Sequence, residues 1–274
     1  MKSPKRTLVI VAFTTLVGCS SPGVPATMPD TSVQTLRLYA TTATLPLVTD
    51  LTGSYGDTRL NFETHSGNLR SALNSLLEGE TSYIFTTHLP APETFPLTLW
   101  AAPIGQDGIA VIVNPVNLVH DLSLDQLREI YQGRISNWRE LGGQDSDLVI
   151  FSREAGSDTR AEFERQVMGQ RKTTLGARLM VTSASMVEAV ASTPGGIGYV
   201  SLAYLTPSVQ ALTIQGIAPD QASILTNQYP LRSSLFVVGL TEPGAANRAC
   251  IGWIQSPAGQ RVVARRYSPL VSPH

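Results

Sequence analysis

A regular alternation of short apolar runs with amphipathic segments begins at Val33 and constrains the fold of this chain more than any other feature. Apolar and β-branched residues predict strands at 36–39, 60–64, 83–85, 109–113, 148–151, 196–200 and 235–238. Helical periodicity predicts helices at 45–51, 69–77, 123–131, around Phe163 and Val167, at 186–191 and at 248–263, with a turn at 66–68. Strands that alternate with helices are typical of α/β folds with a largely parallel sheet.

The composition excludes several classes of protein. The 274 residues are 42% hydrophobic and only 15% charged, which argues against intrinsic disorder, and the length suits one large domain or two modest lobes. Lysine plus arginine (20) nearly balance aspartate plus glutamate (21), so a nucleic-acid partner, which requires clustered positive charge, is not expected. The chain has only three lysines, which also argues against a polybasic membrane patch.

The N-terminus predicts export. Residues 1–18 combine a positively charged start with an apolar run that is too short to span a bilayer, so we interpret them as a signal peptide. The run ends in Leu-Val-Gly-Cys, which resembles the bacterial lipobox and predicts a lipid anchor on Cys19. A plain signal peptide with a chance cysteine is the alternative. Proline and small polar residues at 19–32 then predict a flexible tether.

Export would change both the charge and the cysteine chemistry. Removal of 1–18 takes away three positive side chains and no acidic one, so the net charge falls from −1 to −4. A lipidated Cys19 would leave Cys250 as the only thiol, and an intrachain disulfide would be impossible.

The segment 152–160 carries the clearest chemical signal. A strand ends there, Arg153 follows, and a Gly-Ser-Asp-Thr run opens a helix. Free N–H groups in the first helical turn, the hydroxyls of Ser157 and Thr159 and the planar guanidinium are all suited to binding an oxyanion. The structural alternative is a helix capped by Ser157, with Arg153 in a surface ion pair.

Five segments of this chain follow one another in an order that is found in a known family. They are 106–115, 131–138, 141–143, 152–160 and 196–200. Together they resemble the phosphate-binding solute receptors of bacterial ABC transporters, which belong to the type II periplasmic-binding-protein superfamily. The resemblance is strong from about 103 to 205, looser before that and weak in the last seventy residues. Gly133 and Trp138 within these segments are expected to be structural.

The resemblance implies two α/β lobes joined by two crossing strands, with the ligand in the cleft between the lobes. Lobe I would comprise 33–107 and 232–274, and lobe II 108–231. By position, the implied ligand-binding residues are Thr41, Thr42, Ser66 and Thr87 in lobe I and Arg153, Ser157, Asp158 and Thr159 in lobe II. The implied ligand is inorganic phosphate or a related oxyanion, and the implied partner is the permease of an ABC importer, with the receptor acting as a monomer.

Several positions depart from the family pattern. The family usually has glycine where this chain has Asp158 and where it has Ala40, and some members have aspartate at the position of Thr87. We expect the Asp158 side chain to face solvent and to complement the helix dipole. The alternative is that it turns inward and accepts the proton that phosphate keeps near neutral pH.

The sequence favours a binding protein over an enzyme, with no cofactor and no catalytic residues. The four histidines are scattered without metal-ligand spacing, and no nucleophile elbow, paired-carboxylate signature or Cys-His arrangement is present. Two other functions remain open: a ligand-sensing or adhesive lipoprotein without a transport role, and an exported phosphatase.

Overall fold

The computed structural model describes residues 33–91, 95 and 97–271. The predicted signal peptide, Cys19 and the tether at 19–32 lie outside the described residues. No helix within those ranges is both long and apolar enough to cross a membrane.

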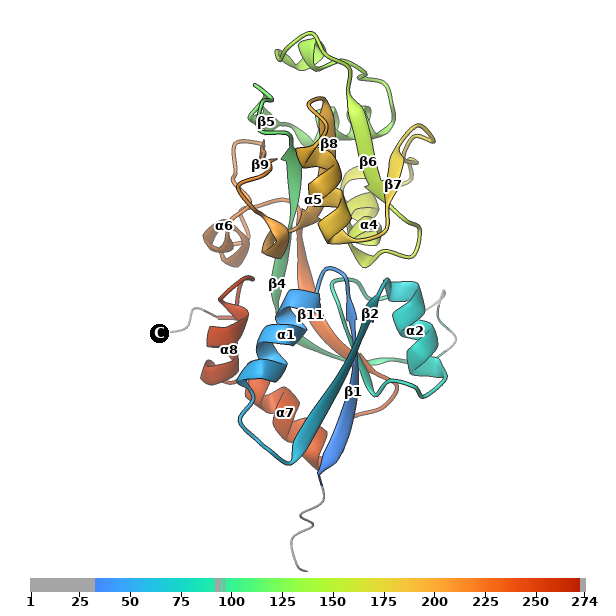
Figure 1. Ribbon diagram of the computed structural model, residues 1–274, viewed down its shortest axis with the longest axis vertical. Helices are drawn as coiled ribbons and strands as arrows, with labels where there is room; N and C mark the ends of the chain where they lie inside the picture. The colour runs from blue at the N-terminus through green and yellow to red at the C-terminus, as the bar shows by residue number, and fades with distance from the viewer. Residues whose placement is uncertain (1–32, 92–94, 96, 272–274) are drawn as a thin grey trace, which may run out of the picture. The chain divides into compact units, whose positions relative to one another are not determined.

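Lobe I is built on five strands in the order β2-β1-β3-β11-β4. These strands are β1 (Gln34–Thr41), β2 (Leu60–Gly67), β3 (Tyr83–Thr86), β4 (Trp100–Val113) and β11 (Arg232–Gly239). The helices around them are α1 (Leu45–Ser54), α2 (Leu69–Leu77), α7 (Ala245–Gln255) and α8 (Pro257–Val263). Apolar residues of α1, α7 and α8 pack with Leu36 and Leu38 of β1, whereas α2 packs on the other face against Ile84 and Val238 (Figure 1).

The long strand β4 continues from lobe I into lobe II. Its residues from Trp100 to Gly108 pair with β11, and those from Ile109 to Val113 pair with β8 (Figure 1). The sheet is therefore mixed: β1, β2 and β3 are parallel to one another, but every pair that involves β4 or β11 is antiparallel. The prediction of a largely parallel sheet holds within the lobes and fails at the crossing strands.

Lobe II contains the strands β6, β7 and β8, of which β6 is parallel to both others. Its strands are β5 (Asp121–Leu122), β6 (Val149–Arg153), β7 (Arg178–Met180), β8 (Gly196–Ser201), β9 (Gln210–Ala211) and β10 (Thr213–Ile214). Its helices are α3 (Leu124–Tyr131), α4 (Asp158–Phe163), α5 (Ser183–Ala191) and α6 (Gln221–Leu225). Short 3₁₀ helices lie at Trp138–Leu141 and Leu202–Tyr204, and a π-helical turn at Glu164–Met168 follows α4.

The core of lobe II fixes the segments that carry the strongest sequence signal. The rings of Phe163 and Tyr199 stack with centroids 4.0 Å apart, which packs the helical segment after the site against β8. The indole N–H of the buried Trp138 donates to the Gly195 carbonyl at 3.0 Å. The expectation that Trp138 is structural is confirmed by this contact.

Local signals explain where most helices begin and end. Ser123 accepts the backbone N–H of Gln126 in a capping box at the start of α3, and Gly133 follows the end of that helix with φ 77°. Both positions match the sequence prediction, because the hydroxyl satisfies a free N–H and glycine tolerates the left-handed backbone.

Two predicted elements differ from the structure. The helix expected at 248–263 is two helices, because Ser256 ends α7 and caps α8, and Pro257 has no N–H to continue a helix. The turn expected at 66–68 is still strand at Ser66 and Gly67, which pair with the last residues of β1.

Candidate functional site

The first half of the site lies at the carboxyl ends of β1 and β3. These strands are parallel neighbours with Ala40 opposite Phe85, so Thr41 and Thr86 leave the sheet at the same edge. Thr44 reinforces this alignment by donating its hydroxyl to the Phe85 carbonyl at 2.8 Å. Thr41 is buried, and so is Thr87, which comes directly after the last residue of β3. Parallel strands therefore bring hydroxyls from distant parts of the sequence together.

The second half lies between β6 and α4. Strand β6 ends at Arg153, and after a short loop the Ser157 side chain caps α4 by accepting the Arg160 N–H at 3.3 Å. Asp158 and Thr159 occupy the first turn of this helix and are almost fully buried. The capping role expected of Ser157 as the structural alternative is thus present, and the next residue, Asp158, contacts lobe I.

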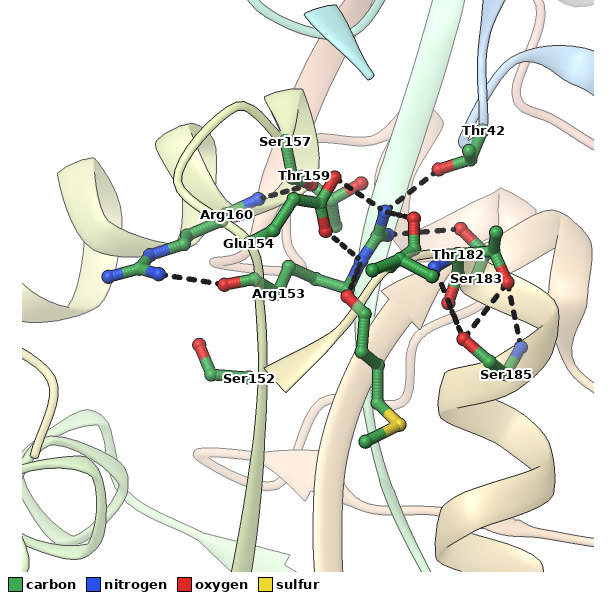
Figure 2. A network of polar contacts seen from close by, with 12 residues as sticks. Thr42, Ser152, Arg153, Glu154, Ser157, Thr159, Arg160, Thr182, Ser183 and Ser185 are labelled. Carbon is green, nitrogen blue, oxygen red and sulfur yellow. Dashed lines mark hydrogen bonds and ion pairs between the residues drawn. The ribbon is translucent and has the colours of Figure 1, made fainter. Parts of the chain in front are cut away.

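Arg153 is completely buried and joins the two lobes (Figure 2). Its guanidinium donates to the Thr42 hydroxyl of lobe I at 2.9 Å and to the Ser183 hydroxyl of α5 at 3.3 Å. Its Nε donates to the Met180 carbonyl at 3.0 Å and forms an ion pair with Glu154 at 3.3 Å. A surface ion pair, the alternative that the sequence left open, is therefore wrong for Arg153.

The Asp158 side chain points inward, so the expectation that it faces solvent is wrong. Only 1% of the residue is exposed. Its Oδ2 accepts the Thr41 hydroxyl at 2.6 Å and the N–H and hydroxyl of Thr87 at 3.1 and 3.0 Å. The physical reason is the density of donors: the ends of β1 and β3 offer this oxygen several hydrogen bonds at once, which outweigh hydration at a solvent-facing position.

Thr159 and Ser66 complete the predicted set in different ways. The Thr159 hydroxyl is buried without a hydrogen-bond partner among the described residues, while its N–H donates to Asp158 Oδ1 at 2.9 Å. Ser66 is exposed at the end of β2, opposite Ala40, and its side chain contacts none of the other seven predicted residues by a hydrogen bond in the described part of the chain. Seven of the eight residues therefore gather at the interface of the lobes.

Sequence reasoning missed three residues that support this set. Thr86 places its hydroxyl 3.3 Å from Asp158 Oδ2, and its position at the end of a strand beside Thr87 was a usable signal. Ser183 follows the capping Thr182 at the start of α5, where helix-start chemistry was also visible. Tyr204 donates its hydroxyl to the Thr42 carbonyl at 2.6 Å, and nothing local in the sequence indicates that contact.

A hydrogen bond between a histidine and a glutamate, and a polar cavity, border the site. His88 Nδ1 lies 2.7 Å from Glu162 Oε1, which connects the end of β3 to α4. Burial raises the pKa of Glu162, but hydrogen bonds from His88 and Arg165 outweigh it and hold the pKa below its ordinary value. A cavity of about 680 Å³ beside Thr87 is lined by residues that include His88, Arg165 and Arg232.

A second buried carboxylate, Asp107, lies where β4 passes between the lobes. It is 1% exposed, faces Ser233 of β11 and accepts the N–H groups of Gly108 and Leu202 at 2.8 and 3.2 Å. Burial raises the pKa of Asp107 to about 7, although these hydrogen bonds and one from Ser201 lower it in part. The described residues contain no group of three or more His, Cys, Asp or Glu side chains placed to hold a metal ion.

Two curated relatives each match less than half of this chain. The chain is 38% identical over 125 residues to the phosphate-binding protein PstS of Bacillus subtilis and 33% identical over 124 residues to phosphate-binding protein PstS 2 of Streptococcus pneumoniae. These segments cover 45 and 42% of this chain, and they span only 41 and 43% of the two relatives.

Solved structures resemble the chain over a greater length. A phosphate-bound substrate-binding protein of a putative phosphate ABC transporter from Clostridium perfringens superposes with a TM-score of 0.82 at 26% identity, covering 87% of this chain and 100% of the other. An ABC-type phosphate transport receptor from Vibrio cholerae gives a TM-score of 0.71 at 21% identity over 85 and 99% of the two chains, which supports the fold alone.

The predicted α/β class and the two-lobed fold of the type II periplasmic-binding proteins are therefore confirmed. The model of the PBP superfamily domain matches residues 25–251, which is most of the sequence. This chain belongs to the PBP superfamily domain family.

Proposed function

We propose that this chain is an exported receptor that captures inorganic phosphate between its two lobes and presents it to the permease of an ABC importer. One observation carries the proposal: the hydroxyls of Thr41 and Thr87 and the N–H of Thr87 already bind an anionic oxygen, that of Asp158. A site that binds one anionic oxygen with neutral donors offers the same chemistry to another.

Two further groups suit a tetrahedral anion. The buried Thr159 hydroxyl has no hydrogen-bond partner among the described residues, so it is a donor that a ligand can use at no cost in protein contacts. Arg153 supplies a fixed positive charge at the same interface, where it already meets Thr42 of lobe I. Both relatives named above and the Clostridium structure carry phosphate in their names, which supports phosphate among the oxyanions.

The finer parts of the proposal come from the sequence. We propose export by the signal peptide at 1–18, a lipid anchor on Cys19, a flexible tether at 19–32 and a monomeric receptor. We also propose lobe limits of 33–107 with 232–274, and 108–231. The relatives are named for binding and transport, which favours a receptor over the exported phosphatase.

The test is isothermal titration of the purified chain with phosphate, sulfate and molybdate, together with thermal unfolding. Phosphate at a hundredfold over its Kd should add roughly 2.7 kcal/mol to the free energy of unfolding. The variant Thr159→Val should bind phosphate at least about tenfold more weakly because it loses one hydrogen bond to an anion, yet its stability without phosphate should not fall, because the hydroxyl that it removes has no partner among the described residues.

The matched control is Thr49→Val, which removes an exposed hydroxyl on α1 and should leave phosphate binding unchanged. Unaltered affinity in Thr159→Val would place the ligand elsewhere. If no anion binds, the alternative function, that of a ligand-sensing or adhesive lipoprotein, becomes the better hypothesis.

A further inference from the structure

Asp158 reaches from lobe II to the anion-binding groups of lobe I. Its Oδ2 accepts the Thr41 hydroxyl at 2.6 Å and two groups of Thr87, the hydroxyl at 3.0 Å and the N–H at 3.1 Å. Its Oδ1 accepts the N–H of Thr159 at 2.9 Å. Because the residue is 1% exposed, both carboxylate oxygens are satisfied by protein donors instead of water.

These hydrogen bonds exclude a second anion from the same donors. A hydroxyl and a backbone N–H each carry a single proton, so Thr41 and Thr87 cannot donate fully to Asp158 and to a dissolved anion together. A second anion beside the carboxylate would also meet its negative charge in a buried space where solvent screens little. Phosphate can use this half of the site only after the Asp158 carboxylate leaves it.

The same hydrogen bonds join the lobes. Asp158 belongs to α4 of lobe II, whereas Thr41 and Thr87 lie at the ends of β1 and β3 in lobe I. The contacts of Arg153 and Tyr204 with Thr42 and of His88 with Glu162 also cross the interface. Each of them rests on a single hydrogen bond, while Asp158 engages four donors of lobe I, the fourth being the Thr86 hydroxyl. The carboxylate thus makes the kind of contact by which an anion between the lobes would draw them together.

We propose that Asp158 is an internal ligand of this chain: its carboxylate occupies the anion position and holds the lobes closed, and phosphate binds only by displacing it. The displacement of Asp158 by phosphate rests on the proposed function, because that function supplies the competing anion. The closure of the lobes by Asp158 does not depend on the proposed function. If the carboxylate holds the donors in about nine molecules of ten, the apparent Kd for phosphate is about tenfold higher than that of the same site without it.

Three variants test the proposal. Asp158→Ala removes the carboxylate, and Asp158→Asn keeps its shape but not its charge. The control Asp125→Asn removes an acidic group from the first turn of another helix, α3, where the side chain is 85% exposed and lies outside the site. Thermal unfolding establishes that each variant is folded.

The first measurement is small-angle X-ray scattering in phosphate-free buffer, which is independent of the proposed function. Wild type and Asp125→Asn should have the same compact radius of gyration. Asp158→Ala should be expanded without an added anion. An equal radius in Asp158→Ala and wild type overturns the closure, whether or not the protein binds phosphate.

The second measurement is the phosphate Kd by isothermal titration. Asp158→Ala should bind phosphate about tenfold more tightly than wild type, Asp158→Asn should lie between them, and Asp125→Asn should match wild type. If Asp158→Ala binds phosphate as tightly as wild type or more weakly, phosphate does not displace the Asp158 carboxylate, and that part of the proposal is wrong. Weaker binding with lost discrimination against sulfate would show instead that the carboxylate accepts the proton of phosphate. No phosphate binding by any variant refutes the proposed function, and the scattering then still decides the closure.

Discussion

Replacement of Asp107 by asparagine should remove a strong pH dependence from the stability of this chain. The carboxyl group is buried between the lobes, and burial raises its pKa from 3.8 to about 7. Because the pKa is raised in the folded state, the folded protein holds this proton over a range in which the unfolded chain has released it. The contribution of Asp107 to stability is therefore most favourable below pH 4 and falls as the pH rises from about 4 to 7.

The structure sets the size of the effect. Between 3.8 and about 7 the pKa changes by roughly three units, and each unit corresponds to about 1.4 kcal/mol, so the loss approaches roughly 4 kcal/mol. Asparagine is neutral at every pH in this range. Its amide oxygen can accept the N–H groups of Gly108 and Leu202 as the carboxylate Oδ1 does. We expect Asp107→Asn to equal wild type near pH 4 and to be more stable by a few kcal/mol at pH 8.

Urea unfolding at half-unit steps from pH 4 to pH 8 measures this difference directly. The control is Asp57→Asn, because the hydrogen bonds from Arg59 lower the pKa of Asp57 to about 2. The stabilising effect of Asp57 is lost as the pH falls from about 4 toward 2, so its variant should differ from wild type by a nearly constant amount between pH 4 and pH 8. If the free energy of unfolding of Asp107→Asn also differs from that of wild type by the same amount at every pH from 4 to 8, the reasoning is refuted.

Two further substitutions test the packing that supports the site. Gly198→Ala should lower the free energy of unfolding by about 1–3 kcal/mol, because the new Cβ would lie 2.5 Å from Met186 Sδ of α5. Its control is Gly252→Ala, whose new Cβ would meet no atom within 4 Å. If Gly198→Ala and wild type unfold at the same urea concentration, the prediction is wrong. Trp138→Phe should cost about 0.5–1.5 kcal/mol, because the Gly195 carbonyl loses the indole N–H and keeps only the N–H of Val149, and an unchanged urea midpoint would show that the indole hydrogen bond is dispensable.

The sequence predicted the elements of the fold wherever a local signal marked them. The start of α3 at Ser123 and its end before Gly133 follow from a capping hydroxyl and a left-handed glycine, which act within a few residues. The limits of the long strand β4 were not predictable in this way. Apolar residues marked only 109–113, whereas its first half, from Trp100 to Gly108, is defined by pairing with β11, more than a hundred residues later in the chain.

The identities of the site residues were more accessible than their orientations. Seven of the eight predicted residues gather between the lobes, because strand ends and helix starts collect hydroxyls and free N–H groups. Ser66 ends a strand in the same way but lies exposed at β2, the outermost strand of lobe I. The order of the strands places β2 beside β1 but one strand away from β3, so Ser66 is separated from Thr87, and local patterning does not contain that order.

Asp158 shows what decides the direction of a single side chain. An acidic residue in the first turn of a helix interacts favourably with the helix dipole whether its side chain points outward or inward. The helix dipole therefore explains why an acidic residue suits this position but does not predict the direction of its side chain. The donors that hold it inward lie 117 and 71 residues earlier, at the ends of two strands that become neighbours only when the sheet forms. An acceptor placed among several buried donors is held there, because leaving would take from the N–H and the hydroxyl of Thr87 the partner that both have in the described structure. The same reasoning makes Asp158 a competitor for any anion that this site binds.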